Sequence, residues 1–173
     1  MITLRPAIRE DISLLEYWDK QPHVRLSDGE EEFWDWQEEL GVEVAWREQL
    51  VAELDGKPIG FVQIIDPYLE ETHYWGEIEP NHRAIDIWIG EADYLNKGHG
   101  TQMMQQAITK CFAPDNVQAI MIDPLKSNRA AHRFYKRFGF KFHEERCFGK
   151  DECYVFRLTR TDWNSHSNNA SIS

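Results

Sequence analysis

The sequence predicts an α/β (α+β) protein in which strands and amphipathic helices alternate along a single domain. Hydrophobic residues make up 42% of the 173 residues and aromatic residues 13%, which is the composition of a protein with a packed core. Apolar residues recur at helical spacing in some segments and alternate with polar residues in others. Asp55-Gly56 separates two strand-like segments, a pattern typical of a two-residue hairpin turn.

The first half of the chain predicts a strand, two helices and a hairpin. Residues 2–6 form the strand, Asp11 is expected to cap a helix through Trp18, and a similar helix covers residues 31–40. Residues 49–54 and 59–65 form the hairpin around Asp55-Gly56. Residues 66–83 are polar, aromatic and irregular, so we expect a loop or ragged hairpin near a site.

The second half predicts strands that alternate with helices. Strands at residues 84–90 and 117–122 are each followed by a helix, at residues 101–112 and 128–138, and Gly139 ends the second helix. Residues 141–145 and 154–158 close the fold around a turn at residues 149–151. The Ser/Asn-rich residues 164–173 are expected to be disordered, which leaves one domain over residues 1–163.

Charge and composition argue against several classes of protein. Thirty acidic against 19 basic residues give a net charge of −11, which repels nucleic acid and favours a cationic partner. No apolar run approaches the roughly 20 residues that span a bilayer, and the N-terminus lacks the features of a signal peptide. We therefore expect a cytoplasmic protein without membrane contact. The three cysteines have no Cys-x-x-Cys spacing and fit reduced thiols, so neither disulfides nor a metal are expected.

A glycine-containing turn precedes the helix at residues 101–112. Glycines without Cβ let backbone N–H groups approach an anion, and the positive end of the following helix dipole adds to the attraction. The sequence therefore predicts a phosphate-binding loop made of Leu95, Asn96, Lys97, Gly98, His99, Gly100 and Thr101.

A second motif lies some thirty residues further on, with the pattern Asn-x-x-Ala-x-x-x-Tyr-x-x-x-Gly-Phe over residues 128–140. Taken together, the two segments resemble the GNAT acetyltransferase superfamily. Within it, the likeness to the aminoglycoside 6′-N-acetyltransferases is greatest and rests on residues 54–63, 85–88, 95–101 and 123–128. Leu95 replaces the usual Gln or Arg of the superfamily loop, but leucine is common there in that subfamily.

The resemblance implies a fold and a co-substrate. The GNAT fold has a mixed central sheet of about six or seven strands flanked by about four helices. Acetyl-CoA would bind with its pyrophosphate on the loop, without a metal. Its pantetheine arm would lie like an added strand between residues 85–90 and 117–123, which diverge in that fold.

The resemblance also implies roles for residues of the second motif and of the strand before the loop. Tyr135 matches the tyrosine that protonates the departing thiolate, although its position also suits a core aromatic. Asn128 and Ala131 would contact the pantetheine arm, although Asn128 could serve only as a helix cap. A backbone N–H around Trp88 and Ile89 would stabilise the oxyanion.

Two aspartates, Asp86 and Asp123, lie in strands otherwise filled by Ile, Trp and Met. A carboxylate in such a strand is costly unless it is paired or faces a wet cavity, so both are candidate bases. The alternative is that each faces solvent on the outer side of its strand. The resemblance implies that both hold ammonium groups of a drug and help to deprotonate its amine, with Trp88 beside the acceptor.

A rigid sugar with several ammonium groups requires several carboxylates and aromatic walls. Acidic and aromatic residues interleave over residues 28–39, although such a run also suits a solvated helix face. A second acidic and aromatic group precedes the strand of Asp86. The expected substrate-binding residues beyond the two aspartates and Trp88 are Trp34, Tyr74, Trp75, Glu77 and Glu79.

The sequence thus predicts an acetyl-CoA-dependent N-acetyltransferase for a polycationic small molecule, with the 6′-amine of an aminoglycoside antibiotic as the first choice and antibiotic resistance as the outcome. A polyamine, a siderophore hydroxylamine or a protein amine is the alternative acceptor. A module that binds acyl-CoA without turnover is a third reading, disfavoured by the presence of Tyr135 and Asn128. Either a monomer or a homodimer is compatible with the sequence.

Overall fold

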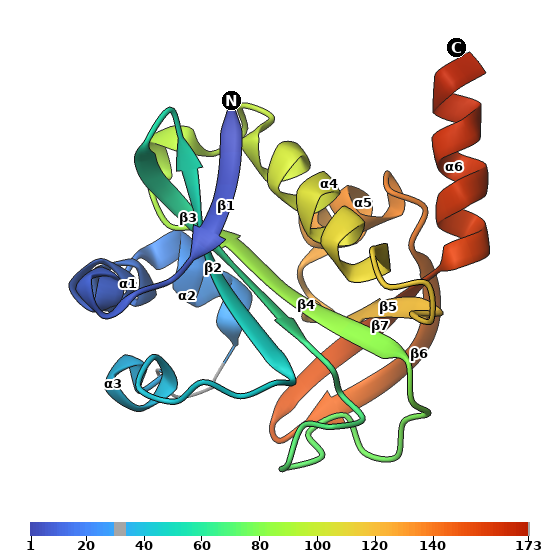
Figure 1. Cartoon of the computed structure of the whole chain (residues 1–173), viewed down its shortest axis with the longest axis horizontal. Helices are drawn as coiled ribbons and strands as arrows, with labels where there is room; N and C mark the ends of the chain where they lie inside the picture. Colours follow the sequence, from blue (N-terminus) through green and yellow to red (C-terminus); the bar gives the residue numbers. More distant parts are fainter. Residues whose placement is uncertain (30–33, 173) are drawn as a thin grey trace. The chain divides into compact units, whose positions relative to one another are not determined.

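The computed structural model describes residues 1–29 and 34–172 (Figure 1). Its seven strands form one mixed sheet in the order β1-β2-β3-β4-β5-β7-β6. Six α-helices occur in the described residues, two more than the resemblance implied. By its contacts the chain divides into two compact units: unit 1 is Met1–Ile65 with Ile85–Ala107, and unit 2 is Asp66–Ala84 with Ile108–Ser173. β4 (His82–Ile89) and α4 (His99–Phe112) each contribute residues to both units.

The predicted hairpin is confirmed in unit 1. β2 (Arg47–Leu54) pairs antiparallel with β3 (Lys57–Ile65), and β1 (Ile2–Pro6) pairs antiparallel with the other edge of β2. The turn residues Asp55 and Gly56 have φ values of 50° and 86°. Positive φ at both positions is what a type I′ turn requires, and this explains the Asp-Gly pair in the sequence.

The helix predicted to begin at Asp11 is present, but its capping is different. A 3₁₀ turn, η1 (Arg9–Asp11), leads into α1 (Ile12–Asp19). The carboxylate of Asp11 accepts bonds from the guanidinium of Arg5, at 2.8 Å to each oxygen, and from the N–H of Ile8 at 2.8 Å. It therefore ties the helix start back to β1 instead of capping the N–H groups of α1.

The prediction of a second helix over residues 31–40 was wrong in its extent. α3 covers only Trp36–Glu39, because the Asp35 side chain accepts bonds from the N–H groups of Gln37 and Glu38 and starts the helix there. Residues 30–33 lie outside the described part of the chain. A further helix that we did not predict, α2 (Pro22–Asp28), begins with proline at its first position.

The core of unit 1 is rich in aromatic residues. Trp18 and Phe61 are fully buried, as are Leu15 and Val51, and Trp36 is 1% exposed. Gly90, just after β4, lies so close to Trp18 that an added Cβ would come within 2.1 Å of its ring. The absence of a side chain at Gly90 thus lets the end of β4 lie directly on α1.

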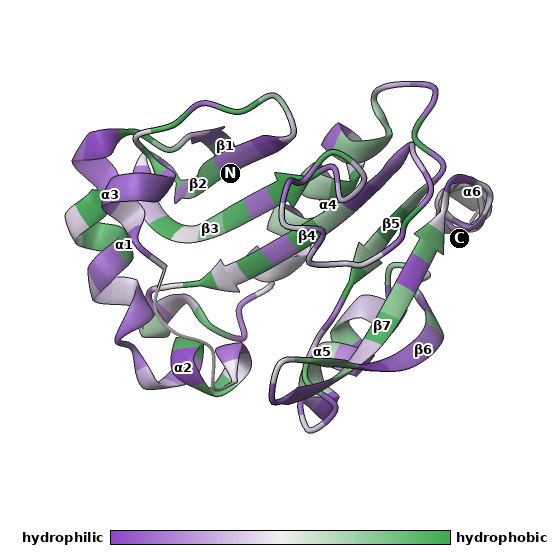
Figure 2. Ribbon diagram, turned by 90° about the horizontal axis from the view of Figure 1, so that it is seen from below, coloured by the Kyte–Doolittle hydropathy of each residue, from purple (hydrophilic) through white to green (hydrophobic). Residues whose placement is uncertain are grey.

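Unit 2 contains the remaining strand pairs. The first residues of β4 pair parallel with β5 (Ala119–Ile122), which pairs antiparallel with β7 (Asp151–Thr159). β7 also pairs antiparallel with β6 (Lys141–Phe148). All four residues of β5 are buried whereas most of β6 is exposed, and Figure 2 shows this contrast in hydropathy. α5 (Arg129–Lys136) lies where the second motif predicted a helix.

The end of the chain differs from its prediction. Residues 164–173 were expected to be disordered, but the structure has a helix, α6 (Arg160–Ile172), drawn in red in Figure 1. Thr159 starts this helix by accepting a bond from the N–H of Asp162 at 3.0 Å. Arg160 anchors it, since its guanidinium donates to the carbonyls of Phe112, Pro114 and Val117. Among the described residues, no helix has both the length and the apolar character needed to cross a bilayer.

The contact between Gly90 and Trp18 predicts a specific sensitivity. Gly90→Ala should lower the free energy of unfolding by about 3 kcal/mol, because the fully buried Trp18 ring has little freedom to move away. Gly56→Ala is the matched control, since nothing lies within 4 Å of a Cβ there, and only the strain of positive φ costs about 1 kcal/mol. Urea denaturation of both variants measures the difference, and equal losses would contradict this account.

Candidate active site

The predicted phosphate-binding loop leads directly into α4. A short 3₁₀ turn, η2 (Ala92–Tyr94), is followed by Leu95, and then Asn96 and Gly98 take positive φ values of 58° and 84°. A Cβ at Gly98 would meet nothing within 4 Å, so the backbone conformation is what favours glycine there. α4 begins at His99, and the first N–H groups of a helix have no partner within it. The turn therefore presents backbone donors at the positive end of a helix, as an anion requires.

Positive charge gathers beside this loop although the chain is acidic as a whole. The ammonium groups of Lys57 and Lys97 lie 5.1 and 5.9 Å from the ring centroid of Tyr94. The ring of His99 is 5.8 Å from the same Tyr94 ring, and its Nδ1 atom is buried without a partner in the described chain. A buried polar atom without a hydrogen bond is costly, so Nδ1 is suited to bond a ligand of the loop. Lys57 was not among the predicted site residues.

Four aromatic rings of unit 1, from Trp34, Trp36, Phe61 and Trp88, form one aromatic cluster. Trp34 and Trp88 were predicted substrate-binding residues, and their ring centroids lie 5.5 Å apart. Phe61 lies 4.8 Å from Trp88, and Trp36 lies 5.1 Å from Phe61. The indole Nε1 of Trp88 is buried and has no partner in the described chain, so the aromatic cluster offers a hydrogen-bond donor that a ligand could engage.

A buried carboxylate, that of Asp19, holds one ring of the aromatic cluster by a hydrogen bond. Oδ2 of Asp19, on α1, accepts a bond from Nε1 of Trp36 at 2.6 Å. Burial raises the pKa of the Asp19 carboxyl above its ordinary value, although the hydrogen bond from Trp36 opposes that rise. Trp36 therefore has a fixed orientation within the cluster.

Asp86 lies on the same face of the sheet as this cluster. It is two residues before Trp88 on β4, and alternate strand residues share a face. Oδ2 of Asp86 accepts a bond from Nε2 of Gln63 on β3 at 3.2 Å. Gln63 was not among the predicted site residues. The signal that could have found it is its place as the single amide in the apolar run over residues 59–65.

The end of β4 is held by two bonds from N-terminal helices of unit 1. Nε2 of His23, on α2, bonds the carbonyl oxygen of Ile89 at 2.9 Å, and a carbonyl only accepts, so this ring nitrogen carries the proton. Nε1 of Trp18 donates to the Glu91 carboxylate at 3.0 Å. Trp88 and Ile89, the predicted oxyanion segment, are thereby fixed in place. Nothing in the sequence distinguished His23, because an isolated histidine has no pattern.

In unit 2 the structure brings Asp123 and Tyr74 together. Asp123 directly follows β5, and its Oδ2 accepts a bond from the hydroxyl of Tyr74 at 3.2 Å. The Tyr74 ring stacks on Phe148 at 4.6 Å with an interplanar angle of 14°. Trp75 is buried and packs edge-on against Phe148 at 5.3 Å, so it supports the Phe148 ring on which Tyr74 stacks.

A buried carboxylate shapes the turn that presents Tyr74. Glu70 accepts bonds from the N–H groups of Thr72 and Tyr74 and from the Thr72 hydroxyl. Burial raises the pKa of Glu70, but these bonds outweigh it, so the pKa lies below its ordinary value. The carboxylate is thus ionised at neutral pH and holds the turn.

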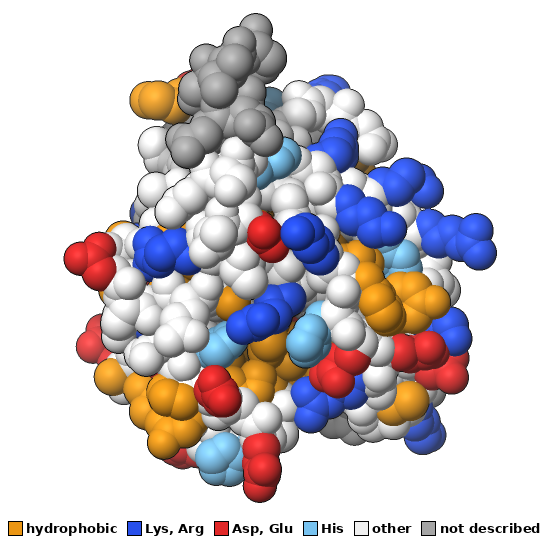
Figure 3. Space-filling view, turned by 90° about the vertical axis from the view of Figure 1, so that its right-hand side faces the viewer, with side chains coloured by type: hydrophobic (Ala, Val, Ile, Leu, Met, Phe, Trp, Pro, Cys, Tyr) orange, Lys and Arg blue, Asp and Glu red, His pale blue; other side chains and the backbone are white. Residues whose placement is uncertain are grey.

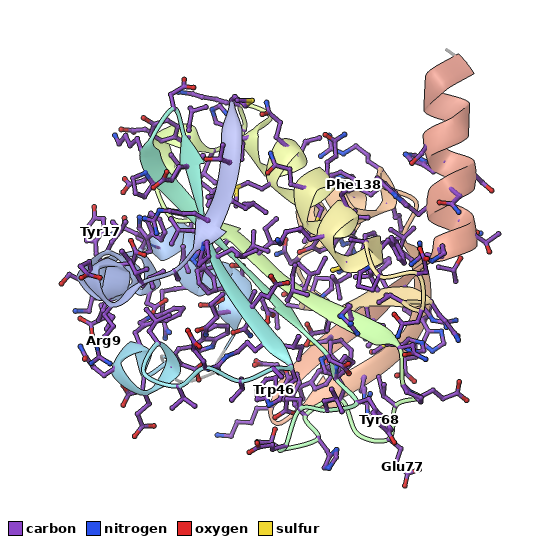
Figure 4. The ribbon with its side chains drawn as sticks, viewed as in Figure 1. Arg9, Tyr17, Trp46, Tyr68, Glu77 and Phe138 are labelled. Atoms are coloured by element: carbon purple, nitrogen blue, oxygen red, sulfur yellow. The ribbon has the colours of Figure 1, made fainter. Side chains whose placement is uncertain are left out.

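Other predicted acidic contacts have different surroundings. Glu77 and Glu79 are exposed, and Figure 4 shows Glu77 reaching away from the ribbon. In the run over residues 28–39, Asp35 caps α3, and Glu39 pairs with Arg47 at 2.6 Å, so both have structural partners. Residues 30–33 of that run lie outside the described chain.

The second motif forms α5 as predicted. Oδ1 of Asn128 accepts a bond from the N–H of Ala131 at 3.2 Å, so the capping alternative for Asn128 is observed, and the cap uses only the oxygen of its amide. Tyr135 is half-buried, with its ring centroid 5.9 Å from that of Phe140. α5 also carries the exposed Arg129, Arg133 and Lys136. On the face that Figure 3 shows, Lys and Arg side chains lie among acidic ones.

Metal ligands do not gather anywhere in the described residues. No group of three or more His, Cys, Asp or Glu side chains there could hold a metal ion.

Comparisons with known proteins agree with this geometry. The family model of the acetyltransferase (GNAT) domain matches residues 7–148. The chain is 31% identical over 148 residues to aminoglycoside N(6′)-acetyltransferase type 1 of Klebsiella pneumoniae, covering 81% of this chain and 74% of that protein. It is 35% identical over 74 residues to a kanamycin resistance protein of Rhizobium radiobacter, covering 42% of this chain and 68% of that one.

Solved structures show the same likeness. Aminoglycoside acetyltransferase AAC(6′)-Ib in complex with coenzyme A and kanamycin superposes with a TM-score of 0.83 at 26% identity, over 95% of this chain and 98% of that one. The complex of the same enzyme with ribostamycin and coenzyme A gives a TM-score of 0.85 at 26% identity, over 94% and 96% of the two chains. By motif, fold and family match, the chain belongs to the GNAT acetyltransferase family, and it is an N-acetyltransferase most like the aminoglycoside 6′-N-acetyltransferases.

Proposed function

We propose that the chain transfers the acetyl group of acetyl-CoA to the 6′-amine of an aminoglycoside antibiotic and so confers resistance. The observation that carries this proposal is the face of unit 1 on which the Asp86 carboxylate lies next to the aromatic cluster. Such a face suits a sugar with ammonium groups, because carboxylates attract the charges and aromatic rings cover the apolar faces of the sugar. The names of the relatives support the same acceptor.

Acetyl-CoA is the acetyl donor, and the loop of residues 95–101 binds its pyrophosphate. Backbone N–H groups at the start of α4 supply the donors, and Lys57 and Lys97 add positive charge nearby. A backbone N–H at Trp88 or Ile89 stabilises the oxyanion of the thioester carbonyl, since His23 and Trp18 hold this segment fixed. Asn128 and Ala131 contact the pantetheine arm.

The reaction proceeds by direct attack. A carboxylate, Asp86 or Asp123, takes a proton from the substrate ammonium, and the neutral amine attacks the thioester carbon. A C–N bond forms to give a tetrahedral oxyanion, and the C–S bond then breaks as the carbonyl is restored. Tyr135 gives its hydroxyl proton to the departing thiolate, and the proton that the acetylated nitrogen loses returns to the Tyr135 phenolate. The proton taken up by the carboxylate is released to solvent. The products are the acetylated drug and coenzyme A with a free thiol.

Recognition of the remaining ammonium groups requires further carboxylates. In unit 2, Asp123 with Tyr74 offers one anionic site whose orientation is fixed by a hydrogen bond and by stacking on Phe148. Trp75 supports Tyr74, and the exposed Glu77 and Glu79 contribute long-range attraction. In unit 1, Trp34 and Trp88 form the aromatic wall.

The acceptor is tested by thiol release. Purified protein with acetyl-CoA should release coenzyme A thiol when kanamycin is added, and mass spectrometry should find the drug heavier by one acetyl group. Polyamines, a hydroxylamine and a peptide serve as competing acceptors in the same assay. Thiol release with one of these and none with kanamycin would reassign the acceptor, while none with any amine would indicate a module that only binds acyl-CoA.

The role of Tyr135 is tested by removing its hydroxyl. Tyr135→Phe should lower kcat by roughly 10- to 1000-fold, because the thiolate then leaves without a positioned acid. Phe134→Leu on the same helix is the control, since it changes a neighbouring ring and removes no proton donor. Unchanged kcat in Tyr135→Phe would take the residue out of the mechanism.

The role of Asp86 is tested by neutralising it. Asp86→Asn keeps the shape of the side chain but removes the charge that attracts the amine, so kcat/KM for kanamycin should fall by roughly 100-fold or more. The dissociation constant for acetyl-CoA, measured by calorimetry, should stay within about twofold of the original. Equal losses of drug turnover and acetyl-CoA affinity would indicate a structural role instead.

A further inference from the structure

A chain of polar side chains in unit 1 leads from α3 across the sheet to Asp86. The Arg47 guanidinium donates to Oε2 of Glu39 at 2.6 Å, and Nε2 of Gln49 donates to the same oxygen at 3.1 Å. Nε2 of Gln49 also donates to Oε1 of Gln63 at 3.1 Å, and Nε2 of Gln63 donates to Asp86 at 3.2 Å. We call these four residues, Arg47, Glu39, Gln49 and Gln63, the polar chain.

The polar chain has a single direction. The Glu39 carboxylate pairs with Arg47 and accepts hydrogen bonds, so Gln49 must turn its NH₂ group toward it. The second proton of that NH₂ group then points to Oε1 of Gln63. Because the oxygen of Gln63 is thereby engaged, its own NH₂ group faces Asp86. The orientation of Gln49 thus determines that of Gln63, and the polar chain ends in an N–H donor to the Asp86 carboxylate.

The position of Gln63 is fixed by packing as well as by hydrogen bonds. Gln63 is 8% exposed, and its strand neighbours Val62 and Ile64, whose side chains point to the opposite face, are 0% and 4% exposed, so this part of β3 is buried on both faces. It is the register partner of Gln49 across the hairpin. A buried amide is costly unless both of its ends are bonded, so Gln63 has little freedom to turn away from Asp86.

The contacts of β3 with β4 show why Asp86 meets Gln63. The N–H of Gly90 bonds the carbonyl of Ile59, Trp88 packs on Phe61, and Asp86 accepts from Gln63. From one pair to the next, the residue number falls by two on β4 and rises by two on β3, as one antiparallel register requires. The Trp88–Phe61 pair and the Asp86–Gln63 pair are therefore neighbours on one face of the sheet. The register that places Trp88 in the aromatic cluster thus also delivers Asp86 to the end of the polar chain.

We propose that Gln63 is a positioning residue for acetyl transfer, because it orients the Asp86 carboxylate and stabilises its ionised form. Glu39, held by Arg47, determines which way the amides of Gln49 and Gln63 are turned, so that the NH₂ group of Gln63 faces Asp86. The proposal rests on the proposed function, in which Asp86 acts on the substrate ammonium. A hydrogen bond donated to a carboxylate favours its charged form and fixes its rotamer. The Asp86 carboxylate is then already oriented to accept a proton when the substrate binds.

The sharpest test is Gln63→Glu, which keeps the length and branching of the side chain. The new carboxylate still accepts from Gln49 but offers Asp86 a like charge instead of a donor, so the two carboxylates compete for one proton. The acidic limb of kcat/KM for kanamycin should move to higher pH, and kcat at neutral pH should fall by roughly 10- to 100-fold. Affinity for acetyl-CoA, measured by calorimetry, should be unchanged.

Two further variants separate positioning from charge and from folding. Gln63→Leu removes the donor without adding charge, so kcat should fall by roughly tenfold without the shift of the acidic limb. Gln118→Glu adds the same charge at an exposed position of unit 2 and should leave both the rate and the pH profile unchanged. If Gln63→Glu does not fold, Glu39→Gln carries the test, because its side chain is 32% exposed and its loss removes the anchor that sets the direction of the amides.

The outcomes distinguish this proposal from the proposed function. If the original protein acetylates kanamycin and Asp86→Asn abolishes this, but both Gln63 variants match the original in rate and pH profile, the role of Gln63 is overturned and the function stands. Loss of acetyl-CoA affinity and thermal stability in step with activity would also overturn it, since that indicates a structural amide. If the original protein acetylates no amine, the function itself fails.

Discussion

The packing of the Trp18 ring against Gly90 is the constraint on which the functional face of unit 1 depends. It brings the end of β4 onto α1, and the bonds from Trp18 to Glu91 and from His23 to Ile89 hold it there. With that end fixed, the alternation of β4 determines which side chains share a face. The aromatic cluster, Asp86 and the amides that reach it therefore have their places set by a contact that itself takes no part in the chemistry.

Each of the two candidate carboxylates accepts a hydrogen bond from a neutral donor. Asp86 accepts from the Gln63 amide, and Asp123 accepts from the Tyr74 hydroxyl. A neutral donor orients a carboxylate without adding a counter-charge, whereas an arginine adds one. Arg5, by contrast, neutralises Asp11, where the bond serves only to fix a helix start.

Much of the fold could be predicted from local rules. Asp55-Gly56, the alternation around Asp86 and the glycine before α4 each imposed a backbone conformation that the structure confirms. The errors arose where a side chain bonds a particular partner that composition and periodicity do not specify. Asp11 bonds Arg5 and Ile8 in place of the start of α1, Asp35 shortens α3, and Arg160 stabilises a helix in a segment whose composition suggested disorder. Gln63 and His23 were missed for the same reason, because their partners are set by strand register and helix packing.

Arg160 places one cation against three carbonyls, those of Phe112, Pro114 and Val117. These belong to the end of α4 and the segment before β5, where main-chain oxygens have no helical donor left. The next turns of α6 present Asn164, Ser165 and His166 to solvent. Substitutions over evolution should therefore be tolerated at these exposed positions and resisted at the Arg160 guanidinium, whose loss would break three hydrogen bonds at once.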